Sequence, residues 1–188
     1  MFNTYTRVLL IFGVLAISMA YKITPYIREG IPDAANVTTA PFLKIGDGYY
    51  RIVPYEQRNW YSAYEQCRKW GSELVTFENV TEYDTVVTYL DQQYGRTARF
   101  WTSGNDLATT GTHNWFTNAE PITLNRWATN QPDNYLGIEH CILIAYVNYN
   151  STNYQLNDSP CANSTALYGY ICEADKPITA SFIITNFS

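Results

Sequence analysis

Four cysteines, at positions 67, 141, 161 and 172, limit the ways in which this chain can fold. Their number is even, none belongs to a Cys-x-x-Cys pair, and neither His113 nor His140 lies at a recognised zinc spacing from them. This pattern disfavours a structural zinc site and predicts disulfide bonds. Four cysteines allow three pairings, and spacing alone does not choose among them.

The first twenty residues have the three-part form of a secretory signal peptide. The single charge of Arg7 precedes an apolar run from Val8 to Ala16, and small residues follow at Ser18 and Ala20. A membrane anchor is the competing interpretation, but an apolar stretch of about 9 to 13 residues is shorter than the roughly 20 that span a bilayer. We therefore expect residues 1–20 to be removed after Ala20 and the protein to be secreted, without a membrane span.

The remaining composition agrees with export. Loss of residues 1–20 removes one positive charge and no negative charge, so the formal net charge of −5 becomes −6. The sequence contains no basic stripe that would indicate a nucleic-acid partner. Glycosylation sequons occur at Asn36, Asn79, Asn150, Asn163 and Asn186. Aromatic residues make up 16% of the 188 residues, which indicates a compact core and a single folded domain.

Turn-forming residues divide the chain into segments. Residues 21–44 contain Pro25, Gly30, Pro32 and Pro41 without a sustained apolar period, so we interpret them as a glycosylated linker. The domain then covers residues 45–174, and residues 175–188 form a C-terminal tail. Residues 43–53, around the turn at 46–48, predict a β-hairpin or strand at the domain entry.

Two helices are predicted near the start of the domain. The first covers residues 60–70, where apolar residues recur every three or four positions and Gly71 follows as a C-terminal cap. The second runs from about residue 80 to residue 94, with Asn79 and Glu82 as a capping-box pair and Gly95 at its end. Asn79 is a less certain glycosylation site for this reason.

Beyond Gly95 the chain consists of short apolar pieces separated by polar turns, which predicts short strands. The stretches 125–137 and 148–160 are polar and rich in turn residues. We interpret both as loops, where binding chemistry is most often displayed.

In this order of elements, a set of residues resembles the C-type lectin domain family. The resemblance covers residues 45–174 and rests on Trp60-Tyr61-Ser62-Ala63 leading to Cys67, then Gly71, Leu74-Val75, Trp101 and Tyr170-Ile171-Cys172-Glu173. The overall sequence pattern is similar to that of secreted, galactose-type lectins of insects. The resemblance implies an α+β fold, the C-type lectin fold, in which two helices flank small antiparallel sheets and a long loop region binds calcium.

The resemblance also selects one disulfide pairing. It implies that Cys67 pairs with Cys172 and that Cys141 pairs with Cys161. The first bond would close most of the domain, and the second would tie the two binding loops together. On the chain-entropy model each would contribute roughly 3 to 5 kcal/mol.

The same resemblance implies one calcium site built from the two loops. Five oxygen-bearing side chains are its expected ligands: Gln131, Asp133, Glu139, Asn157 and Asp158. Three carboxylates and two amides suit Ca²⁺, which takes about six to eight oxygen ligands, and leave positions for a sugar. A second site, as in some relatives, would need acidic groups near Asn134 and His140. We expect these groups to be absent, and therefore one ion.

The order of acid and amide predicts the sugar. In this family Gln-Pro-Asp resembles galactose-type sites, whereas Glu-Pro-Asn resembles mannose-type sites. The five ligand side chains would also bind the sugar, and Tyr135 stands where galactose-type sites place a stacking aromatic ring. Pro132 is expected to be cis. Leu156 replaces a tryptophan that is usual in the family, but that residue packs and is not a ligand.

Two other functions compete with sugar binding as interpretations of the sequence. An enzyme is disfavoured, because the cysteines are expected to be bonded, no G-x-S-x-G elbow occurs and neither histidine lies in a catalytic pattern. The stronger alternative is a lectin-like module that binds a protein. Because one sugar site has only about millimolar affinity, useful binding of galactose-containing glycans favours a homo-oligomer, although no heptad repeat is present. Protonation of the carboxylates should release calcium below about pH 5.

Overall fold

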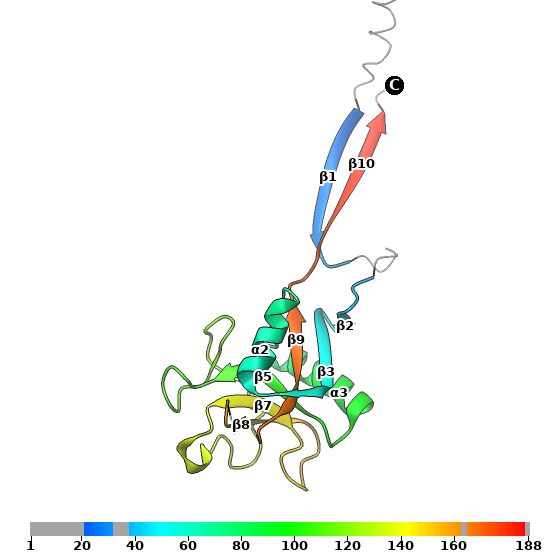
Figure 1. The fold of residues 1–188 in the computed structure, drawn as a ribbon. Helices are drawn as coiled ribbons and strands as arrows, with labels where there is room; N and C mark the ends of the chain where they lie inside the picture. The colour runs from blue at the N-terminus through cyan, green and yellow to red at the C-terminus, as the bar shows by residue number, and fades with distance from the viewer. Residues whose placement is uncertain (1–20, 32–37, 163–164, 187–188) are drawn as a thin grey trace, which may run out of the picture. The chain divides into compact units, whose positions relative to one another are not determined.

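The computed structural model describes residues 21–31, 38–162 and 165–186, and the chain divides into two units (Figure 1). The larger unit spans residues 38–175, and the smaller one combines residues 21–31 with residues 176–186. The expected signal peptide and the sequons at Asn36 and Asn163 lie outside the described residues. Among the described residues, no helix has the length and apolar character needed to cross a membrane.

The strands of the larger unit join in one sheet. Their bounds are β2 Leu43–Ile45, β3 Gly48–Arg58, β4 Glu73–Leu74, β5 Arg99–Asn105, β6 Asn114–Trp115, β7 Cys141–Ala145, β8 Gln155–Ser159 and β9 Tyr168–Ala174. The order is β2-β3-β9-β5-β7-β8, with β4 paired to β9 and β6 to β5. Among the strand pairs of the described residues, only β5–β9 is parallel, so the expected small antiparallel sheets are connected through this pair into one mixed sheet.

Both predicted helices form. Helix α2 spans Trp60–Lys69 and is capped by Asn59, whose side chain accepts a hydrogen bond from the Ser62 N–H. Helix α3 spans Val80–Tyr94, and the Asn79 side chain accepts from the Glu82 N–H, as expected. The reciprocal bond differs from a capping box, because Glu82 accepts from the Glu78 N–H instead.

Strand β7 explains how the two helices are arranged. Ile142 and Ile144 belong to the core cluster that contains the buried residues of α3, whereas Leu143 belongs to the cluster that contains those of α2. Successive side chains of a strand point to opposite faces, so the helices cover opposite faces of the sheet. This burial on both faces accounts for the unbroken apolar run of β7.

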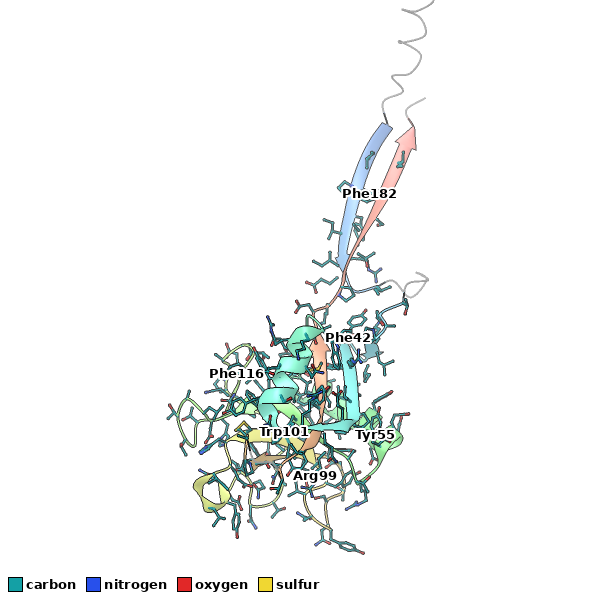
Figure 2. All side chains as sticks on the ribbon, viewed as in Figure 1. Phe42, Tyr55, Arg99, Trp101, Phe116 and Phe182 are labelled. Carbon is teal, nitrogen blue, oxygen red and sulfur yellow. A yellow bond between two sulfur atoms is a disulfide. The ribbon has the colours of Figure 1, made fainter. Side chains whose placement is uncertain are left out.

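The expected disulfides are confirmed, and most of the tryptophans are buried. Cys67 is bonded to Cys172 and Cys141 to Cys161. Trp60, Trp101 and Trp115 are buried, while Trp70 and Trp127 are partly buried against the two clusters. Trp101 lies within the larger unit in Figure 2, and its indole N–H donates to the Arg58 carbonyl at 2.8 Å.

The smaller unit differs from the expected linker and tail. Strand β1, Tyr21–Glu29, pairs antiparallel with β10, Ile178–Asn186, over nine residue pairs. Residues 38–44 belong to the larger unit, which begins before the expected boundary at residue 45. The strand signal in this segment is alternation with a period of two, as at Ile23, Pro25 and Ile27, which the turn residues obscured.

Candidate metal centre

Asp158 lies at the base of the candidate site. It is on β8 opposite Ile142 and is fully buried. One of its carboxylate oxygens accepts from the Asn134 N–H at 2.7 Å, and the other accepts from the Asp133 N–H at 3.3 Å. In the part of the chain that the structure describes, no lysine or arginine forms a salt bridge with it. A buried carboxylate in this setting favours a bound cation.

The loop from Asn130 to Glu139 folds back on itself. The Gln131–Pro132 peptide bond is cis, as expected, and Asn134 has a φ of 44°. The Asn134 side chain accepts from the Glu139 N–H at 3.0 Å, and the Glu139 carboxylate accepts from the Tyr135 N–H at 3.1 Å. These bonds hold the acidic side chains of the loop toward one end of β8.

Three of the five expected ligands come together as carboxylates. One oxygen each of Asp133, Glu139 and Asp158 lies within 4.8 Å of the other two. Burial, followed by the charges of Asp158 and Asp133, raises the pKa of Glu139 to about 7, against a bond from the Tyr135 N–H that lowers it. Like charges at this distance repel, so a divalent cation between them would relieve the repulsion.

Two amide side chains complete the expected set of ligands. The Gln131 side-chain oxygen is buried and has no hydrogen-bond partner, which is unusual for a buried polar atom and suits a metal ligand. Asn157 is half-buried beside Asp158 and donates its amide N–H to the Asp158 carbonyl. The expected metal ligands are therefore all oxygen atoms, which fits calcium.

Two residues beside the expected ligands differ in burial. Leu156 is fully buried in the core cluster of α3, so the departure from tryptophan leaves it in a packing role. Tyr135 is 64% exposed in the short 3-10 helix Tyr135–Gly137 that follows Asn134. Its ring is therefore open to a ligand.

Comparison with known proteins identifies the family. The family model for the Lectin C-type domain matches residues 56–174. The chain belongs to the C-type lectin family. It is 45% identical over 186 residues to C-type lectin 37Da of Drosophila melanogaster, covering 98% of this chain and 99% of that protein. It is 32% identical to C-type lectin 37Db of the same species, over 70% of this chain and 80% of that one.

Solved C-type lectin structures share the fold. The lectin CEL-I from Cucumaria echinata matches with a TM-score of 0.61 at 21% identity, over 77% of this chain and 99% of that one. At this identity the likeness shows the C-type lectin fold alone. The α+β class expected from the sequence is confirmed.

A second carboxylate group of this C-type lectin was missed in the sequence. Glu78, Glu82 and Glu173 also have oxygens within 4.8 Å of one another. Burial, followed by the charge of Glu82, raises the pKa of Glu173 to about 8, and burial and a bond with Glu78 raise that of Glu82 to about 7. Glu78 and Glu82 are four residues apart, but only the strand register brings Glu173 beside Tyr50, whose hydroxyl donates to Glu82.

The expectation that acidic groups are absent near His140 was wrong. The carboxylate of Asp106, which is remote in sequence, accepts a hydrogen bond from the His140 ring at 2.8 Å, and its other oxygen lies 3.8 Å from His113 Nε2. It also accepts from the Gly111 N–H at 2.7 Å. Asp106 does not belong to the group formed by Asp133, Glu139 and Asp158, because these partners hold it elsewhere.

Proposed function

We propose that this protein is a secreted lectin that binds galactose-type sugars through one calcium ion held by Gln131, Asp133, Glu139, Asn157 and Asp158. The observations that carry the proposal are the group of three carboxylates and the buried, unpartnered oxygen of Gln131. Calcium would offer open coordination positions to two neighbouring sugar hydroxyls. Sugar binding at this place accords with membership of the C-type lectin family.

The protein side chains would orient the sugar. Each hydroxyl could accept a hydrogen bond from an amide N–H of Gln131 or Asn157 and donate one to a carboxylate. The order of amide before acid, Gln131 and then Asp133, favours the hydroxyl geometry of galactose. The exposed ring of Tyr135 is available to stack on the apolar face of the sugar.

Export is part of the same proposal. The two disulfides are bonds that persist in oxidising compartments. Cleavage after Ala20 would fall immediately before β1, which begins at Tyr21. Of the described sequons, Asn150 is exposed in a turn and is our preferred glycosylation site, whereas Asn79 uses its side chain to cap α3. The side chain of Asn186 lies outside the part of the protein that the structure describes.

Retention on immobilised galactose tests the sugar proposal. The secreted protein should be retained on galactose-agarose in calcium and should elute with EDTA. A double variant, Gln131→Glu with Asp133→Asn, keeps the number of carboxylates while reversing acid and amide. This variant should bind calcium, pass through the galactose column without retention and be retained on mannose-agarose.

The outcomes separate the two candidate functions. If the unmodified protein bound calcium but passed through both columns, the galactose proposal would be wrong, and the result would favour the protein-interaction module. Retention that EDTA does not abolish would contradict the role of calcium. N-terminal sequencing that found Met1 retained would contradict the signal peptide.

A further inference from the structure

The two-stranded sheet of the smaller unit has one apolar face. Partners across an antiparallel pair point to the same side, and successive pairs alternate. The pairs Ile23–Ile184, Pro25–Phe182 and Ile27–Ala180 therefore share one face. The opposite face carries Thr24–Ile183, Tyr26–Ser181 and Arg28–Thr179. We call the first of these the ribbon face; it ends at the pair Glu29–Ile178.

The large side chains of the ribbon face are exposed. The exposed fraction is 59% for Ile23, 68% for Ile27, 62% for Phe182 and 61% for Ile184. Phe182 is labelled on β10 in Figure 2. An isolated two-stranded sheet is marginally stable in water, and a continuous exposed apolar face marks an interaction surface. The ribbon face therefore needs a partner surface that covers its apolar side chains.

We propose that the ribbon face of a second copy of this chain covers it, giving a symmetric dimer. A two-fold interface requires a surface that complements itself, and matched isoleucines at Ile23 and Ile184 on the two strands provide one. Charge does not oppose the contact, because Arg28 lies on the opposite face, β10 contains no charged residue, and Glu29 stands at the end of the ribbon face.

The size of the ribbon face sets the expected affinity. Nine residues at about 3.3 Å each give a length of about 30 Å, and two strands give a width of roughly 10 Å. Two copies would bury on the order of 600 Å² in total, which is below the standard size of specific interfaces. We therefore expect a weak dimer, with a dissociation constant in the range of about 10 to 100 μM.

Self-association does not depend on the proposed sugar site. If that site binds sugar, however, a dimer would present two sites to one glycan surface and raise the overall affinity. The dimer is therefore tested in solution without sugar and in EDTA, so that failure of the dimer and failure of sugar binding are separate results.

Matched double variants of the complete secreted protein provide the test. Phe182→Thr with Ile184→Thr removes one aromatic residue and one isoleucine from the ribbon face. Tyr26→Thr with Ile183→Thr removes the same types of residue from the opposite face, where both are 61% exposed. Threonine is well tolerated in strands, so each variant preserves the β propensity of the ribbon.

Sedimentation equilibrium at about 1 to 100 μM measures the association. The unmodified protein and the Tyr26/Ile183 variant should dimerise. The Phe182/Ile184 variant should dissociate at least about 100-fold more readily, because symmetry removes four large side chains from one interface. A monomeric unmodified protein, or equal weakening by both variants, would overturn the proposal.

Discussion

The Asn134 N–H donates a hydrogen bond of 2.7 Å to the buried carboxylate of Asp158, which joins the first binding loop to the end of β8. The Asp133 N–H donates to the other oxygen of the same carboxylate. Asp158 therefore positions the backbone of the loop that carries Asp133 and also contributes an oxygen to the carboxylate group. The two functions of one side chain make it the most sensitive position of the proposed site.

The variant Asp158→Asn should weaken calcium binding more than removal of one charge alone would. It eliminates a carboxylate, and an asparagine amide cannot accept at both positions that now receive backbone N–H groups. We expect the calcium dissociation constant to rise by at least about 100-fold, as measured by isothermal titration calorimetry.

A matched control for this variant is Glu120→Gln, because Glu120 is an exposed acidic residue outside the carboxylate group. It should leave the calcium affinity unchanged. Equal affinity in the Asp158 variant, with the fold intact by circular dichroism, would exclude Asp158 as a ligand.

Calcium affinity should depend on pH near neutrality because of Glu139. Burial raises the pKa of this carboxyl to about 7 without the ion, and calcium binding needs the deprotonated form. Affinity should therefore fall as pH drops below about 7, by up to tenfold per pH unit. This window lies above the value near 5 that ordinary carboxyl groups predict. Titrations at several pH values would contradict the prediction if affinity stayed constant between about pH 7 and pH 5.

The same pKa shift acts on the stability of the calcium-free protein in the opposite direction. Because the folded-state pKa of Glu139 exceeds its ordinary value of 4.5, folding favours the protonated form. The contribution is complete below about pH 4.5 and disappears as pH rises through about 7. Calcium should consequently stabilise the protein most at neutral and higher pH, which thermal unfolding with calcium and with EDTA can measure.

Local patterns predicted the helices, and the family resemblance predicted what local patterns leave open. The three-to-four-residue period of Trp60, Ala63 and Cys67 is a property of one helix and is visible in the sequence. By contrast, the sequence alone allowed three disulfide pairings, and the pairing of Cys67 with Cys172 joins residues 105 positions apart. Only the resemblance supplied it.

The features that were missed depend on contacts between distant segments. Strand β1 pairs with a strand that begins about 150 residues later. The sequence of either segment alone does not identify its partner strand. The group formed by Glu78, Glu82 and Glu173 likewise requires the register that places Glu173 opposite Tyr50. Asp106 and His140 meet through the same kind of long-range contact.

Glu173→Gln should stabilise the calcium-free protein at alkaline pH. Burial and the charge of Glu82 raise the pKa of Glu173 to about 8, so above that pH the fold must hold a buried charge near other carboxylates. Glutamine removes the charge but retains an oxygen for the Thr76 N–H, which donates to Glu173 at 3.1 Å. In EDTA at about pH 8.5 we expect a gain of about 1 to 2 kcal/mol, or roughly 3 to 6 °C in Tm.

The gain from this variant should vanish below about pH 3.5, where Glu173 is protonated in both the folded and unfolded states. Asp84→Asn provides a contrast of opposite sign. The bidentate ion pair with Arg126, at 2.8 and 2.9 Å, lowers the pKa of Asp84, so this variant should lose stability at neutral pH. A Glu173 variant that is less stable at pH 8.5 in EDTA would contradict the repulsion argument.

The two disulfides should separate stability from calcium binding. The bond between Cys67 and Cys172 closes a span of 105 residues, and the bond between Cys141 and Cys161 closes one of 20. On the chain-entropy model they contribute about 5 and about 3 kcal/mol, respectively. Replacing the Cys67 pair with alanines should therefore lower the free energy of unfolding more.

Replacing the Cys141 pair should preferentially weaken calcium binding, because that bond connects the start of β7, which follows Glu139, to the segment after Asp158. Denaturant unfolding in EDTA and calcium titration of both variants would contradict this assignment if the Cys141 pair left calcium affinity unchanged.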